Sequence, residues 1–171
     1  DEPSRVDLIR IPIIFILGKY SREIVIGIQG DNMSELRSNP EKLISTAKHF
    51  VGDGGSYRGI DQGNTILSLE DLLEQHGQGF YTAIDAGVQT IMASFNSWNG
   101  DKIHGNKYLL TDILKNQMGF DGFVVGDWNG HGQIPGCSNG SCPESLIAGV
   151  DMYMVPEKWK DLYRITLRQA K

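Results

Sequence analysis

The chain has 171 residues, of which 40% are hydrophobic and 22% charged, and its formal net charge is −5. The length and composition are those of one globular domain. The acidic balance argues against nucleic acid as a partner, because binding a phosphate backbone requires a basic face. The longest apolar run, residues 11–17, is too short to span a membrane, which takes about 20 residues.

Strand-like and helix-like segments alternate along the chain. The expected strands are residues 10–16, 46–51, 89–95, 123–126 and 151–155. The expected helices are residues 21–28, 68–86, 106–118, 143–149 and 157–170. Ser68, with Asp71 three residues later, is a helix-capping pattern, and Gly87 and Gly119 are typical of helix C-termini. The repeated strand–loop–helix units favour an α/β fold with parallel strands.

The polar, glycine-rich loops follow the expected strands. A (β/α) barrel and a doubly wound sheet both place their active sites at this end of the strands, so loop position does not separate the two folds. A complete eight-stranded barrel takes at least about 200 residues. The chain is therefore too short to close the usual barrel.

Two basic side chains, Lys48 and His49, end the strand expected over residues 46–51. Both can donate hydrogen bonds to sugar hydroxyls, although a structural ion pair and a capped histidine explain them equally simply. The GDGG sequence that follows, residues 52–55, could cradle a phosphate and so support a phosphate-binding (β/α) enzyme. It lacks the ending of a P-loop, and a tight turn is the favoured interpretation.

Only Gly126 separates Asp127 from the apolar run FVV, residues 123–125, and Trp128 follows it. A carboxylate at the end of a buried strand can attack an anomeric carbon, and it can also be a helix cap or a satisfied buried acid. Phe95 and Trp98, in SFNSWNG, could stack on a sugar ring or simply pack. His104, in the HGN sequence that follows, is open to the same two interpretations.

The two cysteines, Cys137 and Cys142, are separated by SNGS. The spacing allows a small disulfide-closed loop, and two free thiols are the alternative. No histidine pair accompanies them at the spacing of metal ligands, so the sequence predicts no metal site here.

Taken in order, six motifs resemble the N-terminal barrel domain of glycoside hydrolase family 3, the group of β-glucosidases and exo-glucanases. The motifs are AKHFVGDGG, GIDQGNT, AGVQTIMASFNSWNG, HGNKYLLTDILK, GFDGFVVGDWNGHG and AGVDMYMVP. They cover residues 42–163 almost continuously. The resemblance implies a partial (β/α)8 TIM-type barrel, with residues 1–171 as a single, incomplete domain.

The start of the chain departs from the family pattern. IRIPIIF resembles an early barrel strand, whereas YSREIVIGIQG resembles a helix that normally lies well downstream. Residues 16–20 therefore look like a junction or deletion. Because missing strands would leave edges unpaired, self-association through exposed barrel edges is expected.

The resemblance also implies roles for individual residues. Asp127 corresponds to the catalytic nucleophile, Lys48 and His49 to ligands of the sugar hydroxyls, and Trp128 to a wall of the pocket. Met92 and Phe95 lie in a segment similar to a strand that lines the same pocket, and Phe95 stands where some relatives carry Tyr. Lys48 is expected to contribute to the field that keeps the nucleophile ionised. No metal or organic cofactor is implied.

The implied activity is that of a retaining, exo-acting β-glucosidase or β-glucan glucohydrolase that releases glucose from the non-reducing end. Its substrate would be a small-molecule or oligosaccharide β-glucoside, and family habit places it in the periplasm or outside the cell. Retention needs two carboxyl groups about 5–5.5 Å apart. No residue here matches the family's acid/base; Glu144, Asp53 and Asp61 lie in suitable loops, but none is assigned.

Two alternatives follow from these departures. The chain could be a truncated, non-catalytic fragment that at most binds sugar. A β-N-acetylglucosaminidase is less favoured, because such enzymes typically carry KHFPGHG and an Asp-His acid/base pair, whereas this chain has KHFVGDGG with no matching histidine.

Overall fold

The structure is a computed structural model that describes residues 7–171, with side chains from residue 15 onward. Its helices are α1 (Asp7–Gln29), α2 (Met33–Ser38), α3 (Leu69–Leu72), α4 (Gln78–Asp85), α5 (Pro143–Ala148) and α6 (Trp159–Gln169). Its strands are β1 (Thr46–Phe50), β2 (Asn64–Thr65), β3 (Thr90–Ala93), β4 (Ser97–Trp98), β5 (Asp101–Lys102) and β6 (Phe123–Val125). Leu73–Gly77 and Tyr108–Gln117 are π-helical.

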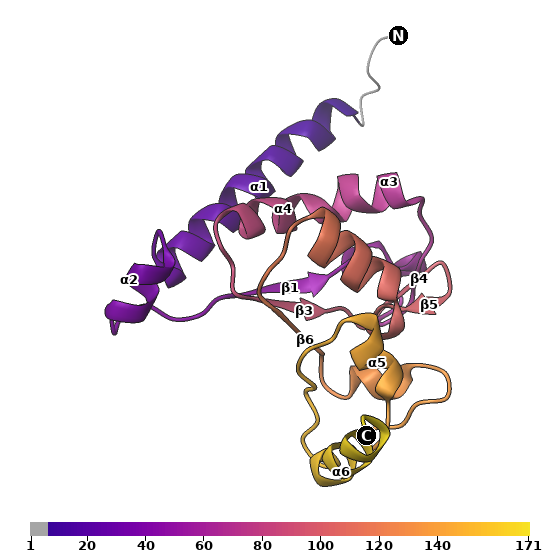
Figure 1. The fold of residues 1–171 in the computed structure, drawn as a ribbon. Coiled ribbons are helices and arrows are strands. Elements are labelled where there is room, and N and C mark those ends of the chain that lie inside the picture. Colours follow the sequence, from indigo (N-terminus) through magenta and orange to yellow (C-terminus); the bar gives the residue numbers. More distant parts are fainter. Residues whose placement is uncertain (1–6) are drawn as a thin grey trace.

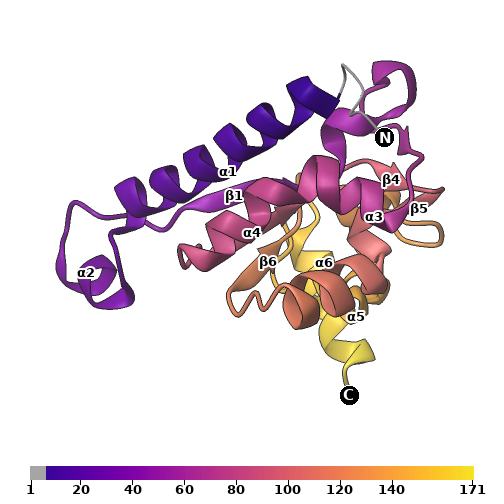
Figure 2. The same ribbon diagram turned by 90° about the horizontal axis from the view of Figure 1, so that it is seen from above.

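The central sheet has three parallel strands in the order β1–β3–β6. Its register aligns Ala47 with Ile91 and Ile91 with Val124, so these three side chains share one face. Helices α1 and α4 pack against each other on that face and run alongside β1 (Figures 1 and 2). The predicted α/β fold with parallel strands, part of a barrel too short to close, is confirmed.

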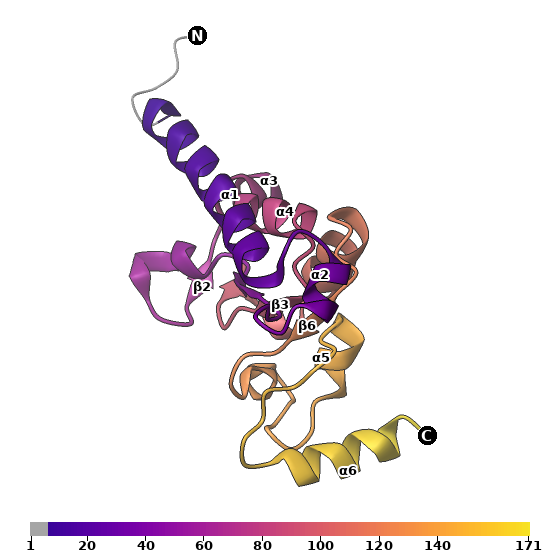
Figure 3. The same cartoon turned by 90° about the vertical axis from the view of Figure 1, so that its left-hand side faces the viewer.

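The segment 10–16 is helical, and the strand predicted there is wrong. It forms the first half of α1, which continues without a break to Gln29 and ends at Gly30, where φ is +90°. A short apolar run cannot be assigned to strand or helix by periodicity alone. Phe15 and Ile16 remain exposed, which a buried barrel strand would not allow, and the N-terminal part of α1 extends past the rest of the domain (Figure 3).

The strand predicted at residues 151–155 is reduced to an isolated bridge between Val125 and Met152. The backbone N–H groups of Asp151 and Met152 both donate to the carbonyl of Val124, and the Asp151 carboxylate accepts the N–H of Val124 at 2.8 Å. A side chain thus takes the place of a backbone carbonyl beside β6. For this reason, the segment follows the sheet without extending a regular ladder.

The loops that follow β1 and β3 bind each other. Their short strands form a second sheet in the order β2–β4–β5. The Asn96 amide donates to the Val51 carbonyl and to the Thr65 hydroxyl, and Thr65 donates to Gly52. Gly52 has a φ of +92° and begins a 3-10 turn over Asp53–Gly55, as the tight-turn interpretation of GDGG predicts.

A buried glutamine ties together the opposite ends of β1 and β3. Gln29, the last residue of α1, is 3% exposed. Its Oε1 accepts hydrogen bonds from the Ser45 N–H, the Ser45 hydroxyl and the Gln89 N–H, and its Nε2 donates to the Gly87 carbonyl. These bonds give partners to the backbone N–H groups of Ser45, which is buried, and Gln89, which is half-buried.

The predicted helix termini agree with the structure. Ser68 caps α3 by accepting the Asp71 N–H, and Gly87, Gly119 and Gly149 adopt positive φ at helix ends. Helix α6 lies at the far end of the molecule from the start of α1 (Figure 3). Within the described residues, no helix combines the length and apolar character needed to cross a membrane.

Candidate active site

Asp127 stands two residues beyond the end of β6 and is held by its own backbone. Its N–H donates to His104 Nε2 at 2.8 Å, and its carbonyl accepts the Gly130 N–H at 2.9 Å. Its carboxylate is fixed as well, because Oδ1 accepts the N–H of Trp128 at 2.7 Å. The side chain is 15% exposed. The carboxylate is therefore oriented at the strand end while part of it remains open to solvent.

His49 lies between two carboxylates. Its Nε2 is 3.6 Å from Asp127 Oδ2, and its Nδ1 is 3.6 Å from Asp53 Oδ2. These separations exceed a hydrogen bond but lie within the range of an ion pair. The ends of β1 and β6, which are not neighbours in the sheet, thus bring His49 to Asp127 as the predicted site requires.

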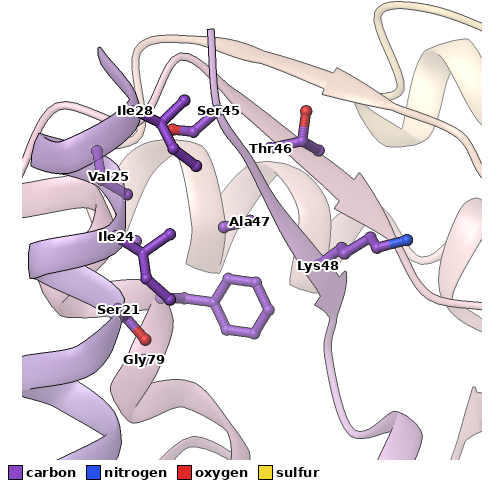
Figure 4. A pocket seen from close by; sticks show the side chains of 11 residues that line it. Ser21, Ile24, Val25, Ile28, Ser45, Thr46, Ala47, Lys48 and Gly79 are labelled. Atoms are coloured by element: carbon purple, nitrogen blue, oxygen red, sulfur yellow. The ribbon is translucent and has the colours of Figure 1, made fainter. Parts of the chain in front are cut away.

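Lys48 is exposed, and its side chain extends away from α1, whereas Ala47 points toward the helices (Figure 4). It lines a cleft of about 290 Å³ between α1, β1 and α4. Among the predicted site residues, only Lys48 lines that cleft, and most of its other lining residues belong to α1 and α4. This cleft is therefore separate from the surroundings of Asp127.

The remaining predicted residues lie around the same strand ends. Met92, on β3, is half-buried and is aligned with Val125 of β6. Phe95 follows β3, and the centroid of its ring lies 5.9 Å from that of His104. Trp128 is 59% exposed, which leaves its indole free to contact a ligand. Trp98 instead donates its indole N–H to the Leu67 carbonyl and packs against the core.

His104 is the neighbour of Asp127 that the sequence alone left undecided. It is 1% exposed, and burial lowers its pKa from 6.5 to about 4, more than the nearby Asp127 charge raises it. The ring is therefore neutral at ordinary pH. Because Nε2 accepts the Asp127 N–H, the ring proton belongs on Nδ1, on the side that bonds with the Ser94 backbone. The only signal in the sequence was its HGN motif.

The loop after Asp127 is closed by a Cys137–Cys142 disulfide, which answers the question of whether these thiols are free. His131, buried beneath this loop, contacts the Asn139 carbonyl through Nε2 at 3.1 Å and packs its ring edge-on against Tyr153. Glu144 Oε2 lies 3.2 Å from Cys137 Sγ. A disulfide sulfur carries no proton and no thiolate charge. The cluster of Cys137, Cys142 and Glu144 therefore does not offer cysteine ligands to a metal.

Comparison with known proteins identifies the fold. Residues 16–170 match the model of the "Glycosyl hydrolase family 3 N terminal domain". The chain belongs to glycoside hydrolase family 3. Among solved structures, an exo-1,3/1,4-β-glucanase (ExoP) from a Pseudoalteromonas species is 50% identical, with a TM-score of 0.89 over 92% of this chain. A β-glucosidase from Listeria innocua, solved with isofagomine, is 26% identical, with a TM-score of 0.76 over 90% of this chain.

Curated members of family 3 include enzymes named for two different sugars. A β-xylosidase from Formosa agariphila is 36% identical over 121 residues, which is 70% of this chain and 16% of that protein. A β-glucosidase from Rhizobium radiobacter is 33% identical over 122 residues, or 70% of this chain and 13% of that protein. The chain spans 25% of the exo-glucanase and 22% of the Listeria β-glucosidase. It thus corresponds to a minor part of each of these family 3 proteins.

Proposed function

We propose that this chain carries the nucleophile of a retaining, exo-acting family 3 β-glucosidase or β-glucan glucohydrolase, and that the nucleophile is Asp127. In the reaction, Asp127 Oδ2 attacks C1 of the terminal glucosyl unit, the glycosidic oxygen leaves with a proton from an acid, and water then releases glucose. The observation that carries the proposal is the carboxylate itself. It is partly exposed, it is oriented through Oδ1 by the Trp128 N–H, and its Oδ2 faces His49 at 3.6 Å.

His49, Lys48 and Trp128 have separate tasks in this proposal. His49 lies close enough to Asp127 to donate to a hydroxyl of a glucosyl unit whose C1 is within reach of Oδ2. Lys48 supplies a second donor from the open face of β1, and the exposed indole of Trp128 provides an apolar surface for a sugar ring. Two structures of the Listeria β-glucosidase, one in complex with glucose and one, of a mutant, in complex with laminaribiose, support a β-glucoside as the substrate class.

An activated fluoroglycoside tests the nucleophile without requiring the acid. A 2,4-dinitrophenyl 2-deoxy-2-fluoro-β-glucoside has a leaving group that departs unprotonated, so a competent nucleophile alone traps the sugar. Peptide mapping by mass spectrometry should find one sugar on Asp127. Asp127→Asn should abolish the adduct, and Asp61→Asn, a change to an exposed carboxylate in another loop, should retain it. No adduct, or an adduct that survives Asp127→Asn, would contradict the proposal.

The same experiment tests the choice of sugar. The corresponding 2-fluoro-xyloside lacks the hydroxymethyl group of glucose, so the ratio of the two labelling rates reports whether the pocket uses that group. Faster labelling by the glucoside supports the proposal. Faster labelling by the xyloside would reassign the substrate to the class named by the β-xylosidase relatives.

Binding of sugar without turnover is the second candidate. The sequence offers no match to the acid/base of the family, and two of the loop carboxylates are engaged elsewhere. Glu144 lies against the disulfide, and Asp61 accepts from the Gln62 amide. Glucose-dependent shifts in the NMR spectrum without any covalent labelling would favour this candidate.

Export from the cytoplasm and self-association also remain proposals. The Cys137–Cys142 disulfide supports an oxidising compartment, because disulfides rarely persist in a reducing cytosol. Strand β1 is at the edge of the three-stranded sheet, and Leu43 and Ile44, which precede it, are exposed. An unpaired edge beside apolar side chains is the kind of surface that associates.

A further inference from the structure

His104 contacts Asp127 from outside the central sheet. It belongs to a 3-10 turn over Ile103–Gly105, after the hairpin formed by β4 and β5, and reaches across to the loop that follows β6. We infer that His104 is a positioning residue, whose Nε2 holds the Asp127 backbone N–H and thereby sets the direction of the Asp127 carboxylate. This inference rests on the proposed role of Asp127 as the nucleophile.

The backbone and carboxylate of Asp127 are mechanically coupled. Because Oδ1 accepts the N–H of the very next residue, Trp128, the carboxylate keeps this direction only while that bond holds, and the bond depends on the orientation of the peptide that joins the two residues. The Asp127 carbonyl is held by the Gly130 N–H, and the preceding residue, Gly126, donates its own N–H to the segment that runs beside β6. Along the chain, the hydrogen bond from the Asp127 N–H to His104 lies between these two backbone hydrogen bonds. It fixes the peptide that joins Gly126 to Asp127, the last one before the carboxylate.

The imidazole is buried and closely packed on one side. A Cβ placed on Gly130 would lie 2.3 Å from Nε2, so the backbone of Gly130 lies directly against the ring, whereas a Cβ on Gly126 would meet Cδ2 in ordinary contact at 3.5 Å. Phe95 packs near the ring with a centroid separation of 5.9 Å. On the side of Gly130, Nε2 therefore has little space in which to follow a displaced Asp127.

The hydrogen bond also requires a particular protonation state. A protonated imidazole has N–H groups on both nitrogens and cannot accept. The charged and titratable groups that face the ring are Asp127, which favours the protonated form, and His131 and Lys102, which disfavour it. Burial is the largest cause and lowers the pKa of the ring further, so the neutral form with its proton on Nδ1 results. Nε2 is thereby kept as an acceptor over the pH range in which a glycosidase carboxylate is ionised.

Two amide side chains of different length separate positioning from packing. The carboxamide of His104→Gln can place its oxygen where Nε2 lies, whereas that of His104→Asn is one methylene too short. At saturating fluoroglucoside, His104→Asn should label Asp127 about 10- to 100-fold more slowly, the usual cost of a misplaced reacting group. Its half-saturating concentration should change little, because the proposed hydroxyl ligands lie on β1. His104→Gln should recover most of the rate.

Controls distinguish this role from a structural one. His131→Gln removes a second buried imidazole from the same region, one that contacts the Asn139 carbonyl, and because burial rather than His131 is the main cause that keeps His104 neutral, it should label at nearly the unsubstituted rate. Gly130→Ala displaces the ring of His104 while keeping it, and it should slow labelling as His104→Asn does, even if the latter folds poorly. Nitrogen NMR of the unsubstituted chain at neutral pH should show the proton of His104 on Nδ1 and an unprotonated Nε2.

The outcomes separate the two proposals. Failure of the unsubstituted chain to label at Asp127 would remove the nucleophile and, with it, the positioning role. Normal labelling of that chain, together with an unchanged rate in His104→Asn and Gly130→Ala, would overturn the positioning role alone. A proton on Nε2 of His104 would overturn it regardless of the labelling results.

Discussion

Gly130→Ala tests whether the ring of His104 is as tightly enclosed as the structure indicates. The added Cβ would lie 2.3 Å from Nε2 and 2.4 Å from Cε1 of a ring that is 1% exposed. These separations are about 1 Å inside an ordinary van der Waals contact, and Gly130 does not have the positive φ that would add backbone strain. Overpacking of this kind costs about 1–3 kcal/mol, and the lost hydrogen bond to Asp127 adds about 1 kcal/mol. We therefore expect the free energy of unfolding to fall by about 2–4 kcal/mol.

Urea denaturation followed by circular dichroism measures this loss. Gly54→Ala is the matched control, because its Cβ meets nothing within 4 Å and its φ is not positive. It should be neutral or stabilising by about 0.4–1 kcal/mol. Replacing His104 by Ala in the Gly130→Ala background should recover part of the cost, since the two changes share one contact. Equal stability of Gly130→Ala and the unsubstituted chain, or strict additivity in the double variant, would refute the reasoning.

Two further predictions concern buried polar groups. Gln29→Leu removes the acceptor of the Ser45 and Gln89 backbone N–H groups, so it should lower the free energy of unfolding by about 2–4 kcal/mol in urea titrations. Gln133→Leu, at an exposed glutamine, should change the free energy of unfolding little. A similar loss in Gln133→Leu and Gln29→Leu would contradict the role given to Gln29. The second prediction follows from the His104 pKa, which burial lowers from 6.5 to about 4. As pH falls, the unfolded chain protonates His104 before the folded chain does. The free energy of unfolding is therefore not reduced by this group above pH 6.5, and it decreases between pH 6.5 and 4 by at most about 3 kcal/mol. Urea midpoints measured from pH 7 to 4 should therefore fall more steeply for the unsubstituted chain than for His104→Gln. Parallel pH dependences of the midpoint in the two proteins would contradict this prediction.

The sequence by itself determined the family and most of the local structure. Motifs in a fixed order, capping at Ser68 and glycines at helix ends are encoded in short stretches, and the structure reproduces them. The three strands of the central sheet were also predicted, because each is a short apolar run that alternates with helix-like segments and is followed by a polar loop. The assignment of Asp127 and its companions came from the same motifs and stays a prediction until the labelling experiment is done.

Only the tertiary structure decided how segments distant in the chain use one another. Residues 10–16 are helical because they continue into α1, and residues 151–155 fail to form a regular strand because the Asp151 side chain occupies the edge of β6. The contact of His104 with Asp127 joins residues 23 apart, and that of Gln29 with Gln89 joins residues 60 apart. Such contacts depend on the relative positions of loops in space. No local pattern of residue types specifies those positions, so the partner that holds Asp127 could be recognised only in the folded chain.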